Sequence, residues 1–241
     1  MNSETITNKI AEKLLINLRE KLERLPTVTI SRCLMGDLVR YDGSHKSLEQ
    51  LRSPLARFLE LKPFCPEIAA GMGVPRKPIQ WVESDAGELR LQQVDTPQLK
   101  FDQTLSDTCE DWLTGQPTLD AGILKARSPS CGSGNTPIYS TSGQKLRDSD
   151  GQWAISLKHA YPNIWLIDEE QCAGLDKVYA VVTALYLQQL QRQTPKSGLS
   201  RELQTVEPRA LLSQHSTENT RIYQLIASWL NQRPTDNSSS A

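Results

Sequence analysis

The hydrophobic residues follow two different periods along the chain. Between residues 4 and 24, apolar side chains recur at every fourth position, which places them on one side of a helix that Pro26 ends. Residues 27–31 then form a short apolar run that predicts a strand. Strand-length and helix-length patterns continue to alternate as far as residue 193. It predicts an α/β fold, with a Rossmann-like and mainly parallel sheet flanked by helices.

The other elements are predicted from the same two periods and from the positions of glycine and proline. Gly- and Pro-rich segments such as 71–78 predict irregular loops. Helices are expected near 47–60, 104–115, 153–160, 176–193, 201–213 and 218–231. Strands are expected near 61–64, 88–94, 122–126 and 164–167, with a small hairpin over 138–146.

These elements divide the chain into four parts. We expect residues 1–26 to form an N-terminal helical extension and residues 27–175 to form the α/β domain. Residues 176–232 are expected to form a C-terminal helical extension, with a linker at 194–200, and residues 233–241 a disordered tail.

The charge balance excludes one class of function. The 241 residues carry 27 Lys and Arg against 28 Asp and Glu, a formal net charge of -1. This excludes a strongly basic nucleic-acid binder that works through bulk charge. The apolar runs are shorter than the ~18–20 residues of a membrane helix, and the first residues lack the apolar core of a secretory signal. We therefore expect a cytoplasmic protein with neither a membrane nor DNA as its partner.

The candidate chemistry lies in five cysteines, Cys33, Cys65, Cys109, Cys131 and Cys172. An odd number in a cytoplasmic chain argues against a disulfide framework. Cys33, Cys65 and Cys131 each follow a predicted strand, and ligands of open α/β sheets bind at the carboxyl ends of strands. Thiolates suit iron–sulfur clusters, whereas structural zinc sites usually show paired CxxC motifs, which this sequence lacks. Spacing alone leaves open whether these three are ligands or incidental, and Cys109 and Cys172 fit packing roles.

Three segments around these cysteines resemble the signature blocks of the thiouracil desulfurase family. The blocks are long, stand in the same order and have similar spacing. They are ISRCLMGDLVRYDGSHK at 30–46, CPEIAAGMGVPRKP at 65–78 and ILKARSPSCGSG at 123–134. The resemblance extends over roughly residues 27–172 and leaves most of both helical extensions outside.

The resemblance implies a desulfidase that works without net redox chemistry. Members of this family hold an oxygen-sensitive 4Fe-4S cluster through three cysteines, which match Cys33, Cys65 and Cys131 here. The open iron would bind the thiocarbonyl sulfur of a thiolated pyrimidine and polarise the C–S bond, so that water attacks the carbon and hydrosulfide leaves. The expected substrate is a thiolated base or nucleoside, ahead of tRNA, because the C-terminal part is shorter than the second domain of the relatives that act on tRNA.

Three polar residues near the cysteines are candidates for catalysis. Glu67 follows Cys65 by two positions and is expected to be the general base, both by position and by the resemblance. Its ordinary alternative is a carboxylate in the first turn of a helix. Ser128 and Ser130 flank Cys131 and are expected to orient the substrate or transfer a proton. Their alternative is a serine-rich turn with local backbone hydrogen bonds.

Basic residues in the blocks are candidates for substrate binding. We expect contacts from His45 and Lys46, which end the first block, and from Arg76 in the second. These blocks also contain a wider set of cations that would suit a nucleotide phosphate or a tRNA backbone, or else be ordinary surface charges. The set is Arg32, Arg40, Arg76, Lys77, Lys125 and Arg127.

Two other functions are compatible with the sequence. One is a hydrolase that uses Cys131 or Cys65 as a nucleophile with His45, and it would be active in air without iron. The other is a non-catalytic iron–sulfur or zinc binding module, which would bind metal but release no sulfide.

Overall fold

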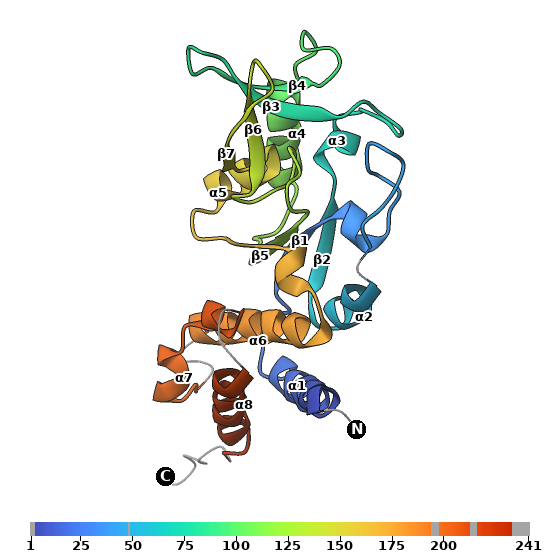
Figure 1. Ribbon diagram of the computed structural model, residues 1–241. Coiled ribbons are helices and arrows are strands. Elements are labelled where there is room, and N and C mark those ends of the chain that lie inside the picture. Colours follow the sequence, from blue (N-terminus) through green and yellow to red (C-terminus); the bar gives the residue numbers. More distant parts are fainter. Residues whose placement is uncertain (1–2, 48, 194–197, 213–215, 233–241) are drawn as a thin grey trace. The chain divides into compact units, whose positions relative to one another are not determined.

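The structure is a computed structural model that describes residues 3–47, 49–193, 198–212 and 216–232 (Figure 1). The chain forms two units. Thr27–Ala173 make up the first, here the α/β unit, and Met1–Pro26 with Gly174–Ala241 make up the second, here the helical unit. The expected disordered tail at 233–241 lies outside the described residues.

A parallel sheet forms the centre of the α/β unit. Its strands are β1 (Thr27–Ser31), β2 (Glu60–Phe64), β5 (Ala121–Leu124) and β8 (Trp165–Asp168), in the order β2-β1-β5-β8. All neighbouring strands pair in parallel, and every residue of β1 and β5 is buried. The chain passes from β1 to one side of it and later returns to the other side, so the order reverses between β1 and β5. Open α/β sheets bind their ligands outside the carboxyl ends of the strands at such a reversal.

A second sheet, which is mixed, belongs to the same unit. It contains β3 (Ile79–Glu83), β4 (Leu89–Gln93), β6 (Thr136–Ser140) and β7 (Lys145–Ser149), in the order β4-β3-β6-β7. The β3 and β6 strands are parallel, and the two outer pairs are antiparallel. The sequence patterns predicted β4 and the β6–β7 hairpin but missed β3, because the Gly- and Pro-rich stretch directly before it indicated only a loop. The predicted α/β fold class is confirmed, with this mixed sheet as an addition.

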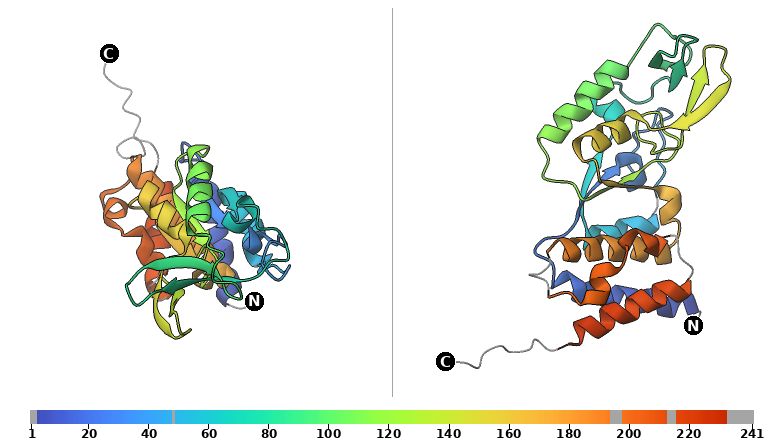
Figure 2. Two further views of the ribbon diagram at one scale, coloured as in Figure 1. Left: turned by 90° about the horizontal axis from the view of Figure 1, so that it is seen from above. Right: turned by 90° about the vertical axis from the view of Figure 1, so that its left-hand side faces the viewer.

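Helices and short 3-10 turns connect the strands of both sheets. They are η1 (Arg32–Met35), α2 (Glu49–Phe58), α3 (Pro66–Ala69), α4 (Asp102–Thr114), α5 (Gln152–Ala160) and η2 (Glu169–Cys172). The α4 and α5 helices pack side by side (Figure 2).

An aromatic cluster lies in the core beneath α4 and α5. The rings of Phe64 and Trp112 stack with centroids 4.6 Å apart, and Trp153 lies 4.7 Å from Phe64 and 5.2 Å from Trp112. Cys109 belongs to the same buried cluster, and burial raises the pKa of its thiol to about 12. Cys172 is also buried. The Cys109 thiol therefore stays protonated at neutral pH. Both cysteines are buried, which is typical of packing residues.

The helical unit consists of elements from both ends of the chain. They are α1 (Ser3–Arg19), α6 (Leu175–Arg192), α7 (Arg201–Thr205), η3 (Pro208–Leu212) and α8 (Ser216–Leu230). The α6 helix is buried along most of its length and packs against α1 and η3. The first helix ends at Arg19, five residues before the predicted end at residue 24. None of the helices that the structure describes is both long enough and apolar enough to cross a membrane.

The aromatic cluster gives a test of this core. Trp153 is fully buried, so Trp153→Ala removes its contacts with Phe64 and Trp112 and leaves a cavity. We expect the free energy of unfolding to fall by about 3–5 kcal/mol in chemical denaturation followed by circular dichroism. Ile155 lies on the same helix but is 40% exposed, and Ile155→Ala should cost no more than about 0.5 kcal/mol. Equal losses in the two variants would contradict the assignment of this core.

Candidate metal and catalytic site

Three cysteines lie in the segments that follow three neighbouring strands of the parallel sheet. Cys33 lies in η1 directly after β1, and Cys65 is the N-cap residue of α3 directly after β2. Cys131 lies in the loop between β5 and β6. Cys33 and Cys131 are buried and Cys65 is partly buried, and all three are free thiols.

The three thiols lie close enough to influence one another. Burial, together with the neighbouring Cys65, raises the pKa of Cys33 to about 11. Burial also raises the pKa of Cys131, and Cys65 and Cys33 both add to that rise, whereas a hydrogen bond with Ser31 lowers it. The pKa of Cys65 is raised mainly by burial. Such influence between charges is strongest at short range, so Cys33 lies near Cys65, and Cys131 lies near both.

The chemistry of these donors fits an iron–sulfur cluster. Soft thiolate sulfur is the ligand that such clusters take, and a cubane cluster bonds each cysteine to a different iron. It therefore needs three thiols around one space and does not need them to meet at one point. No His, Cys, Asp or Glu side chains in the described part of the chain are grouped to hold a single metal ion. Cys33, Cys65 and Cys131 follow three neighbouring strands of the sheet, and their donor chemistry suits such a cluster.

A partly buried carboxylate lies beside these thiols. Glu67, in the first turn of α3, accepts a hydrogen bond at Oε1 from the Ser130 hydroxyl, 2.7 Å away. Its Oε2 atom lies 2.5 Å from Nε of Arg76. Its negative charge contributes to the raised pKa of Cys65 and of Cys131. The structure thus brings Glu67 and Ser130 into direct contact next to two of the thiols.

The Arg76 side chain points into the protein. Its Nη2 atom donates to the carbonyl of Val39 at 3.0 Å, and its Nη1 atom donates to the carbonyl of Gly73 at 2.8 Å. Its backbone N–H donates to the carbonyl of Tyr41 at 2.9 Å. Arg76 was expected from the sequence to contact the substrate, and the structure shows that its guanidinium contacts groups of the chain itself.

Ser128 shapes the loop that carries Cys131. Its hydroxyl oxygen accepts hydrogen bonds from the backbone N–H groups of Ser130 at 3.3 Å and Cys131 at 3.1 Å. Its carbonyl accepts from the N–H of Gly132 at 2.8 Å and from the hydroxyl of Thr136 at 2.9 Å. These bonds match the serine-rich turn that was the alternative to a catalytic role.

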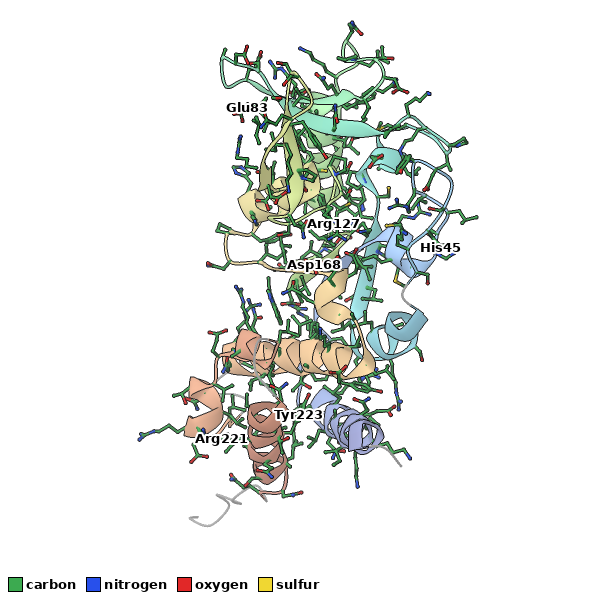
Figure 3. All side chains as sticks on the ribbon, in the orientation of Figure 1. His45, Glu83, Arg127, Asp168, Arg221 and Tyr223 are labelled. Atoms are coloured by element: carbon green, nitrogen blue, oxygen red, sulfur yellow. The ribbon has the colours of Figure 1, made fainter. Side chains whose placement is uncertain are left out.

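His45 and Lys46 lie on the exposed part of the loop after η1, where Figure 3 labels His45. The Nδ1 atom of His45 accepts a hydrogen bond from the N–H of Ser47 at 3.0 Å. The N–H of Lys46 donates to the carbonyl of Cys33 at 2.9 Å, which returns the loop to the cysteine. The side chains of His45 and Lys46 are open to solvent, so both are accessible to a substrate.

The sequence did not predict a role for Glu169, which forms a partly buried ion pair with Lys125. Its Oε2 atom also accepts a hydrogen bond from the N–H of Ala126 at 2.5 Å. The Lys125 charge lowers the pKa of Cys33 and the Glu169 charge raises it. Glu169 follows β8, about 35 residues after the third block, and no motif in the sequence marks it.

Hydrogen bonds through Asn135 form a second link between the loop after β5 and η2. Arg127 has a φ of 58°, which is uncommon for a residue with a side chain. Its N–H donates to Oδ1 of Asn135 at 2.8 Å, and the Asn135 amide donates to Asp168 at 3.1 Å. Asp168 in turn caps η2 by accepting from the N–H groups of Glu170 and Gln171. Figure 3 labels Arg127 and Asp168, the two ends of this link.

Comparisons with known proteins give one family. A family model described as 2-thiouracil desulfurase matches residues 28–170, which is more than half of the chain. The uncharacterized protein YbbK of Bacillus subtilis (strain 168) is 32% identical over 142 residues, 55% of this chain and 90% of that protein. A solved structure of the 4Fe-4S-dependent thiouracil desulfidase TudS is 28% identical with a TM-score of 0.46, and covers 61% of this chain and 92% of that one. The family match lies within the α/β unit and includes Cys33, Cys65 and Cys131.

The tight packing around Gly151 gives a test of how the Cys131 loop is held. A Cβ atom at Gly151 would lie 2.7 Å from the carbonyl oxygen of Ser128 and 2.8 Å from the backbone nitrogen of Cys131. Gly151→Ala must therefore move this loop, at a cost of about 1–3 kcal/mol in unfolding free energy. We expect Cys131 of the metal-free variant to react faster with a thiol reagent, measured by mass spectrometry of the labelled peptides.

Gly115→Ala is the matched control for this experiment. Its Cβ atom would have only an ordinary contact, 3.8 Å from the carbonyl of Trp112. An unchanged labelling rate at Cys131 in Gly151→Ala would show that the loop does not depend on this close approach.

Proposed function

The chain belongs to the 2-thiouracil desulfurase family, and we propose that it removes the thiocarbonyl sulfur of a thiolated pyrimidine base or nucleoside with the help of a 4Fe-4S cluster. The products would be the oxo compound, such as uracil or uridine, and hydrosulfide. Water supplies the new oxygen: one of its protons goes to a base and the other leaves with the sulfur as hydrosulfide. No electrons are exchanged between the substrate and an outside donor.

The grouping of three free thiols beside a partly buried carboxylate supports this proposal most directly. Cys65 raises the pKa of Cys33 and of Cys131, Cys33 adds to the rise at Cys131, and the Glu67 charge raises the pKa of Cys65 and Cys131. We propose that these cysteines hold the cluster. When bound, a cluster with three cysteine ligands supplies an iron without a protein ligand, which is a Lewis acid for the thiocarbonyl sulfur.

The polar residues of the site are proposed to manage water and its proton. Glu67 accepts the proton that water loses as it attacks the thiocarbonyl carbon. Ser130, whose hydroxyl donates to Glu67, provides the hydrogen-bonded path to that carboxylate. Ser128 keeps the Cys131 loop in its shape through bonds to two backbone N–H groups. His45 and Lys46 lie exposed on the loop after Cys33 and are proposed to contact polar atoms of the substrate.

The charge distribution around the site favours a small substrate over tRNA. Every member of the cation set of the three blocks has an acidic partner: Arg32 with Asp37, Arg40 with Asp42, Arg76 with Glu67, Lys77 with Asp95, Lys125 with Glu169 and Arg127 with Glu170. A tRNA backbone requires cations that remain available to its phosphates. The pairing of these cations with carboxylates lowers the net positive charge of the blocks, which supports an uncharged base or nucleoside as the substrate.

The cluster ligands are tested by anaerobic reconstitution with iron and sulfide, followed by a visible spectrum and iron and sulfide counts. We expect a broad visible band and about four irons per chain, as a cubane cluster requires. Cys33→Ala, Cys65→Ala and Cys131→Ala should each lose the cluster. Cys109→Ala and Cys172→Ala are the controls and should keep it, because these two lie in the core. Equal loss in all five variants would contradict the ligand assignment.

The reaction itself is tested by sulfide release from 2-thiouracil and 2-thiouridine with the loaded protein. Glu67→Ala should keep the cluster, since no ligand is changed, and lose about 10²–10⁴-fold in turnover, the range of general base catalysis. Full activity of this variant would remove Glu67 from the reaction. Activity in air without iron would favour the cysteine-nucleophile hydrolase, and a loaded protein that releases no sulfide would favour a binding module.

A further inference from the structure

The Glu67–Arg76 and Lys125–Glu169 ion pairs both lie near the cysteines, and Glu67–Arg76 is the less exposed of the two. Its side chains are only 13% and 6% exposed, respectively. A buried charge needs a partner with good geometry, since an unpaired one is strongly destabilising. The two groups therefore depend on each other for their positions.

Arg76 directly connects the segments after β1 and β2, and through Glu67 it also reaches the loop after β5. It belongs to the segment after β2, and its Nη2 atom donates to Val39 in the segment after β1. Its Nε atom contacts Glu67, which accepts from Ser130 in the loop after β5. The Arg76–Glu67 pair thus joins the loops that carry Cys33, Cys65 and Cys131.

Only an arginine can make this set of contacts. Its guanidinium is planar and presents five N–H donors in fixed directions, of which Nε, Nη1 and Nη2 are used here on Glu67, Gly73 and Val39. A lysine ammonium carries the same charge on one atom and cannot serve three acceptors that lie in different directions. The geometry thus needs the shape of the arginine side chain as well as its charge.

We propose that Arg76 is a positioning residue that fixes the direction of the Glu67 carboxylate, so that Oε2 is held by the guanidinium and Oε1 faces Ser130 beside Cys131. This inference rests on the proposed function, in which Glu67 accepts a proton. Groups that orient a reacting side chain contribute to activity without touching the substrate. Arg76 acts through Glu67 in this proposal and makes no contact with the substrate.

The kinetic test compares Arg76→Gln and Arg76→Lys with Arg147→Gln, all loaded with iron and sulfide. Arg147 lies in the mixed sheet and pairs with Glu83, which Figure 3 labels. Arg147→Gln therefore removes an arginine–glutamate pair from the same unit but from another sheet than the one that carries the cysteines. We expect both Arg76 variants to keep about four irons and to lose about 10–100-fold in kcat with little change in KM. The Arg147 variant should match the unchanged protein.

A double variant separates positioning from a general structural effect. If Arg76 acts through Glu67, then adding Arg76→Gln to Glu67→Gln should cost no further activity. The double variant places two neutral amides where the two charges were, so it remains informative if Arg76→Gln alone does not fold. A further loss in the double variant, a loss confined to KM, or full activity in Arg76→Lys would each overturn the proposal.

Hydrogen exchange provides a readout that does not depend on activity. In the loaded and the metal-free protein, Arg76→Gln should speed amide exchange in residues 36–46 and 128–134, and Arg147→Gln should not. Unchanged exchange in both segments would overturn the positioning role. Absence of sulfide release from the unchanged protein would overturn the proposed function alone, because the exchange measurement would still report whether Arg76 holds the three loops.

Discussion

The parallel pairing of β1 with β2 on one side and β5 on the other is the constraint from which the site follows. Parallel strands end at the same edge of a sheet, and the reversal of strand order at β1 leaves a crevice at that edge. The segments after these strands carry Cys33, Cys65 and Cys131, and no side-chain contact is needed to bring them near one another. The side chains then refine this arrangement, with Glu67 and Ser130 bonded across two of the loops.

Burial gives the site its electrical character. The thiols, the Glu67–Arg76 pair and the Lys125–Glu169 pair are all largely removed from water. Charges act on each other more strongly in the protein interior than in water. Each buried cation is matched by a carboxylate, so the site combines strong local fields with little excess charge. Such a surrounding suits a reaction in which water must lose a proton next to an uncharged ring.

The sequence predicted the parts of the structure that depend on short-range patterns. The strands of the parallel sheet and the long helix α6 could be located because apolar periodicity marks them. The three cysteine segments could be located because they resemble the signature blocks of the family. The β3 strand was missed because the glycines and prolines before it indicate a loop, while its pairing with β4 and β6 depends on residues far along the chain. Glu169 was missed for the same reason, since its contact with Lys125 spans 44 residues. The inward direction of Arg76 also could not be inferred, because a sequence does not tell whether a cation faces the protein or the solvent.

The distances along the chain between the cysteines determine when the site can exist during folding. In a zinc finger, the ligands are close in sequence, and the metal itself organises a short segment. Here the three cysteines come near one another only when β1 pairs with both β2 and β5, the latter in the register Val28 to Ala121. Closing such long loops costs entropy before any contact repays it, which makes parallel sheets slow to form. A cluster held as proposed would therefore enter a sheet that has already assembled, in contrast to the metal of a zinc finger.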